Sequence, residues 1–245
     1  MRYIERMVTN KTGDFSSLDF IAGESLLIDK PPNWTSFKVV HTIKKVINVK
    51  RVGHTGTLDP LATGLLIVLT GKNTKHMIKF QDLDKTYTGT IILGKSSPSM
   101  DTETVMTSKE LPDDLSNEKI YSVRDTFLGQ LTQKPPMYSA LKVNGQKLYH
   151  LARKGKSIDR DLRNIHISKF IITAINLPEI HFEITCSKGT YIRVIANDFG
   201  ERIGCGAVLS SLRRTRIDEY DVQSALTVEE FTNKVSARAH TFETI

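Results

Sequence analysis

Apolar positions along this chain follow two spacings, which separate candidate strands from candidate helices. Strands are predicted where apolar residues run together or alternate with polar ones, at 26–28, 61–69, 85–93, 165–175 and 180–186. Helices are predicted where apolar residues return every three or four positions, at 39–47, 115–131, 191–203 and 226–235. Because these elements interleave without a regular βαβ repeat, the pattern favours an α+β fold, with a mixed, largely antiparallel sheet and flanking helices.

Local signals mark the ends of several of these elements. Thr35 or Ser36 is expected to cap the helix that carries the apolar stripe 39–47, and Pro135-Pro136 to stop the helix 115–131. Asn144-Gly145 is typical of a tight hairpin turn. A second turn joins the strands 165–175 and 180–186, so we expect these two to pair antiparallel.

The same pattern divides the chain into three parts. Residues 1–23 mix charged and small polar residues without a clear period and read as an N-terminal extension. Residues 24–220 contain no flexible linker, repeat or low-complexity tract and are expected to form one catalytic domain. Residues 221–245 form a short tail with one predicted helix.

Composition adds a class of partner and a compartment. The chain has 245 residues, a formal net charge of +7 and a pI near 9.3, which points to a polyanion, most often nucleic acid. Its two cysteines cannot form a disulfide framework, and no Cys or His pair has zinc-ligand spacing. There is no membrane span and no signal-peptide core. We expect a cytoplasmic, metal-free protein without a membrane partner.

The most informative segment is the glycine-rich stretch 53–64, which holds a single carboxylate, Asp59. Its glycines allow the backbone to crowd against a bound ligand, and the apolar run that follows predicts a buried strand to hold the loop rigid. An isolated Asp-Pro pair is more often a simple turn. In this context, Asp59 is a candidate nucleophile or acid/base.

Five segments of the chain resemble, in order, motifs of the TruB family of tRNA pseudouridine synthases. Residues 53–66 match every fixed position of the motif GHTGxLDPxATGxL. The other four resemble the family segments KPxGxTS, QxPPxYSAxK, CSKGTYIR and LRRT, at residues 30–36, 133–142, 186–193 and 212–215. The one departure is Asn33, where the family usually has glycine, and Asn tolerates left-handed backbone geometry.

The resemblance implies a pseudouridine synthase fold and the conversion of the T-loop uridine of tRNA (position 55) into pseudouridine, with no metal and no cofactor. It assigns Asp59 as the nucleophile and Arg193 as its ion-pair partner. It makes Tyr87 the residue that stacks on the target base and transfers a proton. Whether Asp59 attacks the ribose C1′ or the uracil ring stays open at this stage.

The resemblance also implies residues that bind the RNA. His54 takes the place of the extruded base, Tyr191 packs against that base, and Leu209 closes the apolar side of the pocket. Lys30 and Pro31 support the active-site tyrosine. The densest basic cluster after the QxPP segment is expected to grip the T stem, and its members include Lys142, Arg153 and Lys154.

Two alternatives remain beside the tRNA enzyme. One is a pseudouridine synthase for another RNA, such as the guide-dependent relatives. These usually carry an additional PUA-type domain, for which the tail 221–245 is too short, so we expect a stand-alone monomer without an obligate protein partner. The other is a non-catalytic RNA-binding or RNA-folding module on the same scaffold. Lys38, Lys44 and Lys45 are expected on an ordinary solvated helix face rather than on phosphates.

Overall fold

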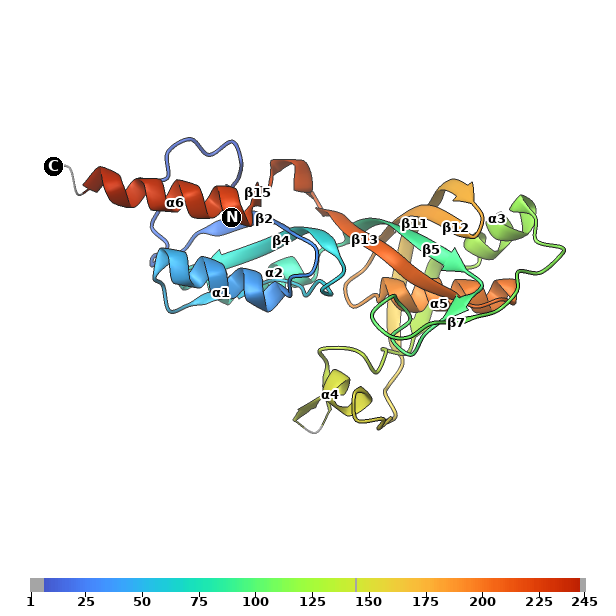
Figure 1. Ribbon diagram of the computed structural model, residues 1–245. Helices are drawn as coiled ribbons and strands as arrows, with labels where there is room; N and C mark the ends of the chain where they lie inside the picture. Colours follow the sequence, from blue (N-terminus) through green and yellow to red (C-terminus); the bar gives the residue numbers. More distant parts are fainter. Residues whose placement is uncertain (1–6, 144, 243–245) are drawn as a thin grey trace. The chain divides into compact units, whose positions relative to one another are not determined.

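The computed structural model describes residues 7–143 and 145–242, and these form two compact units (Figure 1). Unit 1 comprises the described residues of the ranges 1–87 and 212–245, and unit 2 those of the range 88–211. The chain passes between the units twice, once within strand β5 (Lys85–Leu93) and once within strand β13 (Ala207–Ile217).

Unit 1 is built on two antiparallel strands, β2 (Ser25–Lys30) and β4 (Thr63–Thr70), paired from Ser25 with Leu69 to Lys30 with Gly64. Short strands extend this pair: β1 (Met7–Val8) and β15 (Leu226–Thr227) beside β2, β3 (Val52–His54) beside β4, and β14 (Tyr220–Asp221) beside β13. The two central strands are apolar on both faces, which explains their unbroken hydrophobic runs.

Alternate residues of β2 enter two different cores. Leu26 and Ile28 pack with the buried faces of α1 (Ser36–Ile47) and α6 (Val228–Phe242). Leu27 packs with Phe80 of the short helix α2 (Met77–Gln81), which follows the 3₁₀ segment η1 (Gly71–His76). The strands of unit 1 are therefore covered on both faces, and they form a rigid support for the loop between β3 and β4.

The N-terminal segment is part of the same core. Phe15 and Phe20 both meet Phe231 of α6 edge-on, with ring centroids 6.1 and 6.0 Å apart, and Leu18 is fully buried beside them. This segment packs more deeply than its polar sequence indicates, because Phe15, Leu18 and Phe20 all enter this core.

Unit 2 contains four paired strands with helices against them. Its strand order is β5, β12 (Glu179–Cys186), β11 (Arg163–Asn176) and β8 (Gly129–Gln133), with β11 antiparallel to both neighbours. The rings of Phe127, Phe170 and Phe199 pack together between this sheet and the helices α3 (Asn117–Asp125) and α5 (Ile192–Ile203). Smaller elements complete the unit: β6 (Lys95–Ser96), β7 (Thr107–Ser108), β9 (Lys142–Val143), β10 (Gln146–Lys147) and α4 (Leu148–Ala152).

The structure confirms the predicted α+β class with a largely antiparallel sheet. Thr35 caps α1 by accepting a hydrogen bond from Lys38 N, and Gly204 ends α5 with a left-handed backbone. Asn33 has φ = 61°, a left-handed conformation that asparagine tolerates in place of the glycine usual in the family. The predicted 144–145 hairpin turn is flanked by the paired strands β9 and β10, but Asn144 itself lies outside the described residues.

One predicted helix was wrong in its extent, and one long strand was among the elements that were missed. The helix expected over 115–131 ends at Asp125, and Gly129–Gln133 instead pairs with β11. Gly129 has φ = 89°, so the chain leaves the helical region there, and pairing in the sheet overrides a local helical period. Strand β13 was not predicted, because its second half carries arginines where a buried strand would show apolar residues.

Candidate active site

The Asp59 loop connects β3 to β4 in unit 1, and its main chain is held at several points. Ser36, at the start of α1, uses its hydroxyl twice: Oγ donates to Leu58 O at 3.1 Å and accepts from Leu58 N at 2.9 Å. Asn33 N donates to Pro60 O at 2.8 Å, and Ala62 N closes a turn on Asp59 O at 3.0 Å. The half-buried Asp59 side chain is therefore presented by a fixed backbone.

A buried arginine of β13 holds the other side of this loop. Arg214 is 1% exposed, and its Nε donates to Leu65 O at 2.7 Å while its Nη2 donates to Gly56 O at 3.1 Å. Gly64 pairs with Arg214 and has φ = 102°; a Cβ there would lie 2.3 Å from Arg214 O. Sequence reasoning quoted the LRRT motif but gave Arg214 no role. The signal for this role is an arginine within a buried strand, because a buried cation needs buried hydrogen-bond acceptors.

Lys30 holds the same loop from β2. It is fully buried, and its ammonium donates to Trp34 O at 2.7 Å, Pro31 O at 2.9 Å and Pro60 O at 3.3 Å, which uses all three of its donors. Burial lowers the pKa of Lys30 to about 8, against the opposing effect of the Asp59 charge. The Lys30 ammonium thus contacts the carbonyl oxygen of Pro31, the other residue predicted here, and it contacts the Asp59 loop at Pro60.

We expect Lys30→Met to lower the free energy of unfolding by about 2–3 kcal/mol at pH 7, because three carbonyl oxygens lose a charged donor while the cost of burying the charge is recovered. The deficit should grow by about 1.4 kcal/mol at pH 9. There the folded Lys30, with its pKa of about 8, has released its proton and the unfolded one has not, so the unfolded state binds more protons and the parent gains stability. Urea titrations at both pH values measure the difference, and an unchanged deficit would contradict the lowered pKa.

Two further predicted residues lie in unit 1. His54 belongs to β3, and burial first, then the Arg214 charge, lowers its pKa, so the ring is neutral at neutral pH. Among the described residues, its buried Nδ1 has no hydrogen-bond partner. Tyr87 lies in β5 and is 9% exposed. A neutral imidazole suits stacking on a base better than contact with a phosphate.

In unit 2, Arg193 lies in the first turn of α5, and Gln133 holds the start of this helix. Gln133, 3% exposed, accepts from Tyr191 N at 2.8 Å through Oε1 and donates to Tyr191 O at 3.2 Å through Nε2. The Arg193 guanidinium lies 5.9 Å from the Tyr191 ring centroid, so these two predicted residues are brought together. Leu209, in β13, is 2% exposed.

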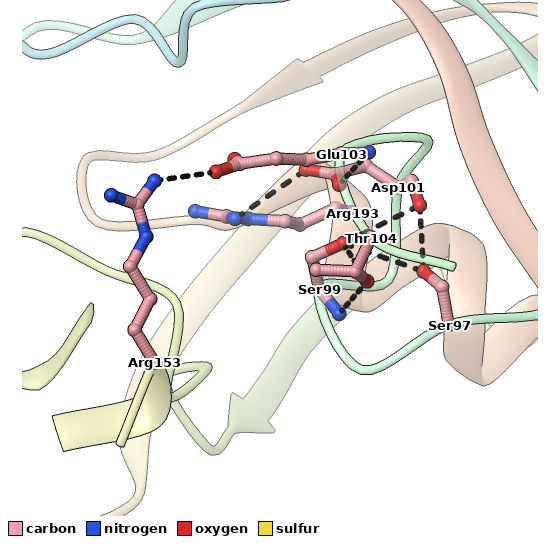
Figure 2. Close-up of polar contacts among 7 residues, drawn as sticks. All are labelled: Ser97, Ser99, Asp101, Glu103, Thr104, Arg153 and Arg193. Atoms are coloured by element: carbon pink, nitrogen blue, oxygen red, sulfur yellow. Dashed lines mark hydrogen bonds and ion pairs between the residues drawn. The ribbon is translucent and has the colours of Figure 1, made fainter. Parts of the chain in front are cut away.

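Figure 2 shows a carboxylate beside Arg193 that sequence reasoning missed. Asp101 is 1% exposed, and its Oδ2 lies 3.5 Å from Arg193 Nη1. The loop that carries it is closed on itself: Ser97 Oγ donates to Asp101 O at 2.6 Å, and Glu103 N donates to Asp101 Oδ1 at 2.9 Å. Leu209 N also donates to Met100 O at 3.0 Å. Nothing in the polar sequence around Asp101 marks it, since its burial depends on these tertiary contacts.

The basic insertion between β8 and β11 is the last predicted region. Arg153 follows α4, is exposed, and pairs with Glu103 at 3.0 Å, as Figure 2 also shows. Lys154 is exposed. Lys142 lies in β9, but its side chain is outside the described part of the structure. Within residues 7–143 and 145–242, no group of three His, Cys, Asp or Glu side chains could hold a metal ion. No helix in that part of the chain is long and apolar enough to cross a membrane.

Comparison with known proteins gives the same family from several directions. The model of the TruB family pseudouridylate synthase N-terminal domain matches residues 44–192, and that of the tRNA pseudouridylate synthase B C-terminal domain matches residues 193–244. A tRNA pseudouridine synthase B from Flavobacterium johnsoniae is 44% identical over 220 residues, which cover 87% of this chain and 96% of the relative. One from Chloroherpeton thalassium is 48% identical over 225 residues, covering 89% and 93%.

A solved structure agrees with these relatives. A chain in the crystal structure of a Cbf5-Nop10-Gar1 complex superposes with a TM-score of 0.67 and 28% identity, covering 87% of this chain and 54% of that one, so this chain spans about half its length. The resemblance seen in the five sequence motifs is confirmed by matches that extend over most of the chain. The chain belongs to the TruB family of pseudouridylate synthases.

Proposed function

We propose that this protein converts the T-loop uridine of tRNA into pseudouridine, with Asp59 as the nucleophile. The observation that carries the proposal is the loop of Asp59, whose main chain is held by three buried side chains from three different elements: Ser36, Lys30 and Arg214. An attacking carboxylate must be held in a productive geometry, and a loop held at several points supports such a role. The relatives named tRNA pseudouridine synthase B favour tRNA as the substrate.

The isomerisation breaks the N1–C1′ bond of uridine, turns the uracil within the pocket and joins C5 to C1′, with the C5 proton removed at the end. Asp59 adds covalently and later leaves, so no metal or redox cofactor is needed. Arg193 is assigned to keep the carboxylate ionised by ion pairing. Tyr87 is assigned to stack on the base and to transfer the proton, because its ring is apolar and its hydroxyl is polar.

The remaining assignments concern RNA binding. The target base is stacked inside a folded loop, so it must be extruded at a cost of a few kcal/mol. His54, neutral in the folded protein, fills the vacated place, and Tyr191 and Leu209 line the apolar pocket. Lys142, Arg153 and Lys154 are assigned to the phosphates of the T stem. Because Arg153 is paired with Glu103, an RNA phosphate that binds Arg153 must displace the Glu103 carboxylate.

Another RNA as the substrate is the second candidate, and it is favoured by the likeness to the Cbf5 complex together with a likeness to an H/ACA RNP bound to a substrate RNA. The likeness to the Cbf5 complex is weaker in sequence, at 28% identity against 44% and 48% for the two tRNA pseudouridine synthase B relatives. We therefore place tRNA first.

The proposal is tested with purified protein and unmodified transcripts of a full tRNA and of its isolated T stem-loop. We expect one pseudouridine, at the T-loop uridine, in both transcripts and in the presence of a chelator, as mapped by mass spectrometry. A transcript with that uridine replaced by cytidine is the control. Modification at a different uridine would remove the substrate assignment, and no modification of either transcript would remove the proposed function.

A further inference from the structure

Residues 30–58 carry a run of positive charge that the proposed chemistry uses only in part. They contain no Asp and no Glu, yet they carry six of the basic residues: Lys30, Lys38, Lys44, Lys45, Lys50 and Arg51. Lys30 is buried, and the other five are exposed. A solvated helix face ordinarily mixes both signs, so a run of one sign over 29 residues is typical of a surface that meets a polyanion.

An aromatic side chain stands in the middle of this basic surface. Phe37 is 74% exposed on α1, and its ring stacks on that of His41 one turn later, with centroids 6.2 Å apart and planes 23° apart. A single exposed apolar residue needs no explanation. A ring pair at i and i+4 with a free outer face, flanked by cations, is the arrangement on which nucleobases stack.

The cations near this ring pair are available to a ligand. Lys38 lies over the Trp34 ring, 3.9 Å from its centroid, and Lys44 and Lys45 follow in the last turn of α1. None of the ion pairs found among the described residues involves any of these three lysines. The Trp34 ring draws the Lys38 ammonium toward the N-terminal half of the helix, next to Phe37.

This surface is rigidly joined to the Asp59 loop within unit 1. Ser36, one residue before Phe37, is hydrogen-bonded through its hydroxyl to both main-chain groups of Leu58. Asn33 N donates to Pro60 O. Hydrogen bonds to main-chain groups on each side of Asp59 thus join the start of α1 to this loop, so a nucleotide on α1 would be held close to one that reaches Asp59.

We propose that the α1 platform, defined as Phe37, Lys38, His41, Lys44 and Lys45, binds an unpaired nucleotide of the substrate RNA beside the target uridine. The Phe37 and His41 rings stack on its base, and the three lysines contact the adjoining phosphates. Extrusion of the target leaves its loop neighbours without a stacking partner, and the platform supplies one. This inference deepens the proposed function and rests on it. It replaces the expectation that the α1 lysines are merely solvated.

The test measures binding of a fluorescently labelled T stem-loop by anisotropy, in an Asp59→Asn parent so that turnover does not interfere. We expect Phe37→Ala to weaken binding about tenfold, and Phe37→Trp to bind at least as well as the parent. Lys44→Gln with Lys45→Gln should lower the slope of log Kd against log salt by about one to two. Val105→Ala removes another exposed apolar side chain, 88% exposed and far along the chain, and should change nothing.

The outcomes separate this inference from the proposed function. If the parent binds no RNA, the proposed function fails and this inference with it. If the parent binds and Phe37→Ala binds equally well, the α1 platform is overturned while the proposed function stands. If Phe37→Ala alters sedimentation but not RNA binding, the ring serves self-association, which also overturns the proposal. A crosslink from 5-iodouridine beside the target uridine to the peptide that contains Phe37 would support it directly.

Discussion

An Asp59→Asn variant is expected to bind tRNA within about threefold of the parent protein and to form no detectable pseudouridine. The hydrogen bonds from Ser36, Lys30 and Arg214 reach the main chain of the loop, so an amide at position 59 leaves them in place. An amide cannot act as a nucleophile, and removal of a catalytic nucleophile costs on the order of 10⁴-fold or more in kcat.

Single-turnover assays with enzyme in excess, followed by mass spectrometry of the RNA, give the required range. Binding is measured on the same preparation. Asp113→Asn, which changes an exposed carboxylate in unit 2, is the matched control and should retain full activity. Residual turnover by Asp59→Asn above about 1% of the parent rate would remove the nucleophile assignment, because no neighbouring group could replace a covalent step to that extent.

The parts of this site that sequence alone could predict are those carried by one contiguous segment. The glycines around Asp59 and the apolar run after it are local features, and they predicted the loop and strand β4 with small errors in their bounds. The cap at Thr35 and the end of the helix predicted over 191–203 depend on residues within one turn of the helix, and both are confirmed. Local physics decides such features, so a local pattern reveals them.

The parts that sequence missed depend on contacts between distant segments. Arg214 lies about 150 residues from the carbonyl of Leu65 that it binds, and the loop of Asp101 reaches Arg193 and Leu209, which are both distant in sequence. Both are charged residues, which a polarity pattern assigns to the surface. The neighbouring residue in the sequence does not indicate the role of Arg214 either. Arg213 is half-exposed and pairs with Asp29 at 2.6 Å, so two adjacent arginines have different roles.

The prediction of a helix over 115–131 was wrong in its extent for a related reason. The apolar spacing there is helical, but Ser116 starts a helix that ends at Asp125, and the remaining residues find hydrogen-bond partners in β11. A strand edge elsewhere in the chain competes with the local preference, and the competition cannot be read from the segment itself.

The buried pair of Asp101 and Arg193 leads to the second large effect. Asp101→Asn is expected to lower kcat by about 100-fold or more with a smaller change in KM, and to reduce the free energy of unfolding by about 2–4 kcal/mol. The side chains of Arg193 and Asp101 are 4% and 1% exposed, so loss of the carboxylate charge removes a buried ion-pair partner of the guanidinium. If Arg193 acts on the Asp59 carboxylate, a displaced guanidinium also slows the chemical step. Steady-state kinetics and urea titrations measure the two effects separately.

Glu103→Gln is the matched control because it changes another acid of the same loop, two residues away, whose partner is the exposed Arg153. An exposed pair contributes about 0–1 kcal/mol, so the control should lose little stability and keep kcat within about threefold. Assays at a temperature at which circular dichroism shows both variants folded separate a positioning role from loss of fold. Asp101→Glu, which keeps the charge but lengthens the side chain, should recover part of the rate. If Asp101→Asn stays folded and turns over as fast as Glu103→Gln, Asp101 contributes to the fold alone and Arg193 does not depend on it for catalysis.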